Sequence, residues 1–163
     1  MIVPTLGPTA ARDYMQPPVP EYISHSPNVV LLRIDGVKRY KIGLRAIALA
    51  GRAGYLRQTY DGDWTLVVRN FQVNPSGDYI DPPWDNTNEW GYAFQGYNDD
   101  GGYGRFGELE YHTPGVGGGS GELSRCDTSQ VWAFEGRQEH IYAITDLLLG
   151  GGVLSTLASI WTE

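Results

Sequence analysis

The carboxylates of Glu108 and Glu110 and the imidazole of His112 are spaced two residues apart along one short run of the sequence. Side chains of a β-strand alternate between its faces, so these three groups are expected on one face and Leu109 and Tyr111 on the other. Two carboxylates in a cleft raise the pKa of one of them by repulsion, which suits general acid–base catalysis, with His112 as a possible proton donor. An exposed, purely solvated strand face is the alternative interpretation.

A second group of chemically versatile residues precedes this run, where aromatic rings alternate with amides and carboxylates. A sugar presents an apolar ring face and an edge of hydroxyls, which aromatic rings and hydrogen-bonding side chains can match. The predicted substrate-binding residues here are Trp84, Trp90, Tyr92, Tyr97 and Asp99. Packing that anchors a loop is the alternative for the rings, and turn chemistry is the alternative for Asp99.

Lys41 completes the predicted substrate-binding residues. It is one of two lysines in the chain and lies in the middle of a predicted strand. Its ammonium group is expected to meet a hydroxyl or a carboxylate, and a solvated strand lysine is the alternative. The single cysteine and the scattered histidines match no metal-ligand spacing, so we predict neither a metal site nor a cofactor.

The elements that must position these residues are mostly strands. Apolar runs predict strands at residues 28–34 and 37–44, and the Asp-Gly pair between them is the strongest two-residue signal for a β-hairpin. Further strands are predicted at 64–71 and 129–134. A helix is predicted at 139–149 from its apolar spacing, and residues 74–103 are predicted to form a long functional loop.

Composition excludes several classes of protein. The formal net charge of -7 argues against a nucleic-acid partner, since phosphate binding needs a basic surface. No apolar run is long enough for a membrane span and no signal-peptide pattern is present, so the chain is expected to be soluble, without a membrane partner. The charge is uneven, because residues 1–69 carry nine Lys and Arg against five acids, whereas residues 70–163 carry three Arg against fourteen acids.

The domain organisation follows from the prolines and glycines. Residues 1–27 hold six of the ten prolines and are predicted to form an extended arm outside the core, because proline lacks the donor that a sheet needs. Residues 28–150 are predicted to form the folded domain, and residues 151–163 a tail. The 22 glycines and few lysines suit a turn-rich, mostly β fold of one domain.

Several stretches, taken in order, resemble the C-terminal half of galactose mutarotase-like proteins of the aldose 1-epimerase superfamily, in a bacterial branch. The matching stretches are Asp35-Gly36 through Leu44, Trp64-Thr65-Leu66, Tyr79 with Pro83-Trp84, Tyr97 to Gly101, Phe106 to Glu110 with Thr113-Pro114, and Leu148-Leu149-Gly150.

This resemblance implies an antiparallel β-sandwich whose concave face binds a carbohydrate, and bacterial relatives imply a periplasmic or extracellular location. In these epimerases a late-strand glutamate is the base on the anomeric hydroxyl, and a histidine from earlier in the chain protonates the ring oxygen. Glu110 is the better match to that base and Glu108 the second. The half that supplies the histidine has no counterpart here, and neither His25 nor His112 stands in its place.

Two functions are expected. The first is carbohydrate binding by loop aromatics and strand carboxylates. The second is a carbohydrate-active enzyme, either epimerase-like or a glycoside hydrolase, with Glu110 or Glu108 as catalytic carboxylate and Asp81, Asp85, Asp99 or Asp100 as a possible second one. Half of a sandwich must either close on itself or pair with a second copy, and pairing as a homodimer is the expectation we favour.

Overall fold

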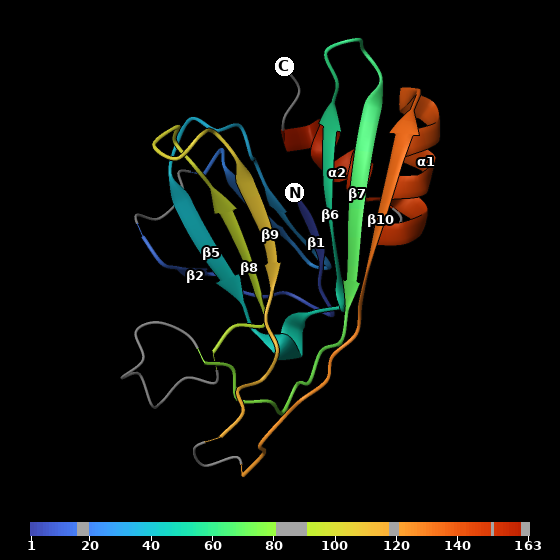
Figure 1. Cartoon of the computed structure of the whole chain (residues 1–163). Helices are drawn as coiled ribbons and strands as arrows, with labels where there is room; N and C mark the ends of the chain where they lie inside the picture. The colour runs from blue at the N-terminus through green and yellow to red at the C-terminus, as the bar shows by residue number, and fades with distance from the viewer. Residues whose placement is uncertain (16–19, 81–90, 118–120, 151, 161–163) are drawn as a thin grey trace.

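The computed structural model describes residues 1–15, 20–80, 91–117, 121–150 and 152–160. Within them, the strands form two antiparallel sheets that pack against each other, and two helices lie beside the larger sheet (Figure 1). The expected fold class, a mostly β antiparallel sandwich with a helix near the C-terminal end, is confirmed. Both sheets come from one chain.

The larger sheet has six strands, of which the three longest pair side by side along most of their length. In spatial order the strands are β10 (Ser129–Gly136), β7 (Trp64–Phe71), β6 (Arg52–Gln58), β1 (Ile2–Pro4), β4 (Val29–Leu32) and β3 (Ile23–Ser26). The turn around Gly62, whose φ of 95° suits glycine, joins β6 to β7. β10 pairs with the other side of β7 along its whole length.

The smaller sheet has four strands in the order β2 (Arg12–Asp13), β5 (Tyr40–Leu44), β8 (Phe94–Asn98) and β9 (Gly107–Tyr111). The expectation of a continuous loop over residues 74–103 is wrong for β8, which is a central strand buried along its length. Its five residues include a glycine and precede two aspartates, so local sequence favours a loop. Pairing with β5 and β9 on both sides stabilises the strand instead.

The first residues of the chain lie in the core. β1 is paired on both sides, with β4 and β6, and Ile2 and Val3 are buried. The prediction that residues 1–27 form an arm outside the core is therefore wrong for this strand. Pro4 is tolerated because it is the last residue of β1, where a missing donor costs least. The prolines misled because they are concentrated after the strand rather than within it.

The predicted hairpin around Asp35-Gly36 is also wrong. Gly36 does turn the chain, with a φ of 70°, but β4 before it belongs to the larger sheet and β5 after it to the smaller one. Val29–Leu32 is buried along its whole length, because it lies between β1 and β3 in a sheet that is covered on both faces. The Asp-Gly pair correctly predicted a turn, but it carried no information about which sheet each flanking strand joins.

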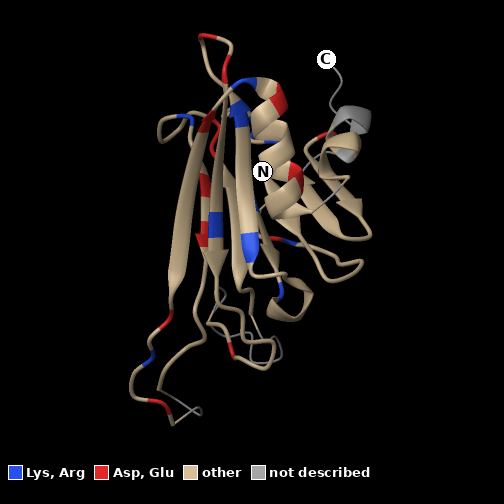
Figure 2. Cartoon of the chain, turned by 90° about the vertical axis from the view of Figure 1, so that its right-hand side faces the viewer, with Lys and Arg blue, Asp and Glu red and all other residues tan. Residues whose placement is uncertain are grey.

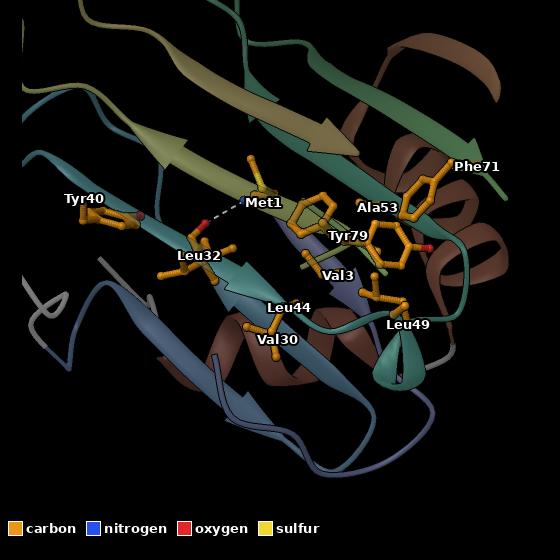
Figure 3. Packing of buried hydrophobic residues seen from close by; sticks show 14 of the residues in the cluster. Met1, Val3, Val30, Leu32, Tyr40, Leu44, Leu49, Ala53, Phe71 and Tyr79 are labelled. Atoms are coloured by element: carbon orange, nitrogen blue, oxygen red, sulfur yellow. Dashed lines mark hydrogen bonds between the residues drawn. The ribbon is translucent and has the colours of Figure 1, made fainter. Parts of the chain in front are cut away.

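Two apolar clusters hold these layers together. The first lies between the sheets and includes Val3, Leu32, Tyr40 and Phe71 (Figure 3). The second lies between the larger sheet and the helices. In the first cluster the amino group of Met1 donates to the Leu32 carbonyl at 2.6 Å, and burial lowers the pKa of that amino group to about 5.

The helices follow β10. α1 (Gln138–Leu149) confirms the helix predicted at 139–149, and its buried residues Ile141, Thr145 and Leu149 follow helical spacing. Leu149 packs directly on Gly54 of β6, where a β-carbon would lie 2.3 Å from a Leu149 methyl group. The segment predicted as a tail begins with a second helix, α2 (Val153–Ile160), whose Val153 is buried in the same cluster.

Candidate functional site

The predicted site residues of the smaller sheet lie on its outer face. Ile42 and Leu109 pack into the core between the sheets, so alternation turns their neighbours Lys41 and Glu108 outward. The register places Lys41 opposite Tyr97 and Tyr97 opposite Glu108, so one row crosses β5, β8 and β9. The sheet thus brings together residues that are 67 positions apart at its extremes.

Lys41, Glu110 and His112 form an ionic cluster in the next part of this face. The Lys41 ammonium lies 2.9 Å from Oε1 and 3.1 Å from Oε2 of Glu110. The Nε2 atom of His112 lies 3.5 Å from Oε2 of Glu110. All three side chains are partly exposed, at 23%, 26% and 31%. Lys41 therefore meets a carboxylate, one of the two partners expected for it.

The two glutamates are electrostatically unequal. Burial alone would raise the pKa of Glu110, but hydrogen bonds from His112 and Lys41 and the charge of Lys41 lower it to about 2. Burial and the negative charge of Glu110 raise the pKa of Glu108, which also shares a hydrogen bond with Glu110. Glu110 is thus held as a carboxylate, and Glu108 is the group that more readily takes up a proton.

This arrangement offers a defined set of polar contacts. Glu110 accepts hydrogen bonds as a carboxylate, and Glu108 accepts or donates according to its protonation state. Lys41 and His112 supply nitrogen atoms at the same surface. A ligand rich in hydroxyl groups, each both donor and acceptor, matches such a mixed surface better than a ligand of single charge.

Tyr97 and Asp99 are committed to the protein's own structure. The Tyr97 hydroxyl donates to Oδ1 of Asp99 at 2.9 Å and accepts from Nε of Arg39 at 3.0 Å. The other oxygen of Asp99 accepts backbone N–H groups of the following turn, those of Gly101 at 2.8 Å and Tyr103 at 3.1 Å. Asp99 is buried, so the alternative of turn chemistry describes it, and its predicted role as a sugar-hydroxyl acceptor is not supported.

Tyr92 is buried as well, with only 6% of its surface exposed. Its ring packs over Gly43 and meets Tyr14 edge-on at 5.9 Å, while the guanidinium groups of Arg12 and Arg45 lie 5.5 Å and 5.7 Å from its centre. Tyr97 is equally buried. Both rings therefore act as packing residues of the outer face, the second interpretation offered for them, and neither presents an open ring face.

Four other residues that were considered for the site lie outside the described residues. They are the predicted stacking residues Trp84 and Trp90 and the candidate second carboxylates Asp81 and Asp85.

The structure adds two exposed rings that the sequence analysis did not select. Phe106 is 38% exposed, and its ring centre lies 5.8 Å from that of Tyr97. Its carbonyl accepts the Asp99 N–H, which continues the pairing of β9, so alternation places Phe106 on the face of Glu108. Tyr103 is 70% exposed and stacks with Arg39 at 5.0 Å. The spacing of two residues between Phe106 and Glu108 could have predicted that both side chains lie on the same face of the strand.

The described residues also bear on metal binding and on membrane-spanning helices. In the described part of the chain, no three His, Cys, Asp or Glu side chains gather as they would around a metal ion. None of the helices described there has the length and hydropathy that a bilayer-spanning segment requires.

The fold and this face define a two-sheet β protein with a polar, aromatic-flanked outer surface. Residues 2–157 match a family described as "Family of unknown function (DUF6786)", and the chain belongs to that family. The match includes most of the segment first expected to be an arm. No curated protein and no solved structure matches the chain, so the resemblance to galactose mutarotase-like proteins stays a prediction.

Proposed function

We propose that the outer face of the smaller sheet binds a saccharide. The observation that carries this proposal is the exposed ring of Phe106 on the same face as Glu108 and the ionic cluster of Lys41, Glu110 and His112. A sugar ring stacked on Phe106 would direct its hydroxyl edge toward the carboxylates and the ammonium group. The exposed ring of Tyr103 lies against Arg39, which also donates to the Tyr97 hydroxyl, so Tyr103 is a second candidate stacking ring.

A carbohydrate-active enzyme is the second candidate, and the unequal glutamates favour it. General acid–base catalysis needs a group that exchanges a proton, and the raised pKa of Glu108 makes it the carboxyl group that is protonated more readily. Glu110 is less suited to be a base, since its pKa is lowered to about 2. The two share a hydrogen bond, whereas glycosidase carboxyl groups lie at least about 5 Å apart across the scissile bond. Binding is therefore better supported than hydrolysis.

Removal of the exposed ring tests the binding proposal. We expect Phe106→Ala to weaken retention on the best-bound polysaccharide about fivefold or more, because ring stacking contributes about 1 kcal/mol or more. Binding is measured by glycan array, then by affinity electrophoresis and calorimetry. Tyr60→Ala is the matched control, since Tyr60 is fully exposed on the turn between β6 and β7, away from this face.

Equal retention of Phe106→Ala and Tyr60→Ala would reject stacking on Phe106, and no retained glycan for the parent protein would reject the function. Turnover is measured in parallel by reducing-sugar release and by polarimetry of mutarotation, with Glu108→Gln and Glu110→Gln beside the parent. Turnover that Glu108→Gln abolishes would replace the binding proposal with the enzymatic one. A periplasmic or extracellular location, which the resemblance suggests, belongs to the same proposal and is tested by cell fractionation.

A further inference from the structure

β10 leaves one side of its backbone without a partner strand in the described residues. It ends the order of the larger sheet, and its eight residues pair with β7 alone. Natural edge strands are usually short or protected by charges, prolines or bulges. β10 is long, holds no proline, and carries a single charge, at Glu135 near its end. Figure 2 shows where acidic and basic residues lie on this side of the molecule. Val131 is 60% exposed and Trp132 is 41% exposed.

We propose that two copies of this chain pair through their β10 edges, antiparallel about a two-fold axis, so that two six-stranded sheets become one. With a two-fold axis perpendicular to the sheet, each face of one copy continues into the same face of the other. Residues paired across the axis must therefore point to the same face, so their numbers differ by an even number. The register centred on Trp132 places Trp132 opposite its own copy and Val131 opposite Ala133. Exposed apolar side chains then meet on both faces of the sheet.

Charge disfavours one neighbouring register, and the position of the Arg69 guanidinium group favours this register over the other. Centred on Trp132, it places Glu135 of one copy opposite Ser129 of the other. A shift that centres the pairing on Val131 places Glu135 opposite Asp127, which sets two carboxylates against each other. A shift that centres it on Ala133 places Glu135 opposite the apolar Val131, whose partner on β7 is Arg69. The register centred on Trp132 instead places Glu135 opposite Ser129, the residue that the guanidinium end of Arg69 reaches.

Arg69 of β7 is the cation that a carboxylate opposite Ser129 would meet. Its Nη2 atom lies 3.4 Å from the Ser129 hydroxyl, and its guanidinium group lies 4.4 Å from the centre of the Tyr111 ring. Its Nε atom is buried and has no hydrogen-bond partner in the described residues. A carboxylate opposite Ser129 would supply an ion-pair partner, and the two-fold axis supplies it twice.

This pairing differs from a dimer that completes a sandwich. Each chain already packs its smaller sheet on its larger one, so the second copy is not needed to cover the core. It covers the edge of β10 instead. The face proposed for saccharide binding belongs to the smaller sheet, so the dimer proposal does not depend on the proposed function.

Analytical ultracentrifugation of the full chain tests the pairing. At tens of micromolar we expect a mass twice the 18.0 kDa of one chain. Trp132→Lys, which opposes two ammonium groups at the axis, and Glu135→Lys, which sets a cation beside Arg69, are each expected to raise the dimer dissociation constant about tenfold or more. Glu139→Lys makes the same change of charge on the exposed start of α1 and is expected to leave the mass unchanged.

The charge exchange Arg69→Glu with Glu135→Lys is expected to recover at least part of the affinity that Glu135→Lys loses. Only proximity of the two groups across the axis produces that recovery. Circular dichroism of each variant confirms that it is folded. A parent protein with the mass of one chain would overturn the proposal. So would a dimer that Trp132→Lys and Glu135→Lys leave intact, because its interface would then lie elsewhere.

Discussion

Replacing Asn98 with alanine is expected to lower the free energy of unfolding by about 3 kcal/mol. The side chain is fully buried, and its Oδ1 accepts the backbone N–H groups of Asp35 and Gly36, each at 3.1 Å. Its amide nitrogen donates to the Lys38 carbonyl at 2.7 Å. Alanine leaves these backbone groups without partners and loosens the segment that carries the chain from the larger sheet to the smaller one.

Urea denaturation measures this loss, and a fall of the melting temperature by about 6–12 °C is expected with it. Asn74→Ala is the matched control. The Oδ1 atom of Asn74 accepts the N–H of Ser76 in an exposed turn, so its loss is expected to cost less than about 1 kcal/mol. Equal costs for the two variants would contradict the view that Asn98 holds the crossing segment in place.

The passage of the chain from the larger sheet to the smaller one at Asp35-Gly36 could not be predicted from the sequence, because it depends on a residue far along the chain. Asp35-Gly36 carries a local signal, and a local signal specifies a turn without specifying the sheet that follows it. The residue that fixes the segment, Asn98, lies more than sixty positions further along the chain. β8, which contains Asn98, was itself missed, because its stability comes from two neighbouring strands rather than from its own composition.

The candidate site also has features that local sequence predicts and features that depend on strand pairing. Strand periodicity was sufficient to place Glu108 and Glu110 on one face, because alternation is a local property. The meeting of Lys41 with Glu110 depends on β8 lying between their strands, which pairing rather than pattern decides. The aromatic residues of the site were predicted from residue type, and residue type does not reveal whether a side chain is buried. Tyr97, which was predicted to bind a sugar, is buried, whereas Phe106, which was not, has an exposed ring.

Lys41→Met is expected to lower the free energy of unfolding at pH 7 by about 2 kcal/mol, because it leaves the partly buried Glu110 carboxylate without its cation. The pKa of Glu110 falls from 4.5 to about 2 on folding, so its ionic contacts stabilise the fold above pH 4.5 and lose that effect as the pH falls toward 2. Glu108 acts with the opposite sign, because its raised pKa makes its ionisation costly as the pH rises.

The pH profile therefore separates the ionic role of Lys41 from its packing. Urea denaturation at pH 7, 4.5 and 2.5 is expected to show the difference between parent and Lys41→Met shrinking as Glu110 is protonated. Lys38→Met is the matched control, since Lys38 is about half exposed and lies 3.9 Å from the exposed Glu21. Its effect is expected to stay below about 1 kcal/mol. A deficit of Lys41→Met that is equally large at all three pH values would show that the lysine stabilises the sheet through its alkyl chain, and the outer face would then lack the ion pair from which its chemistry is argued.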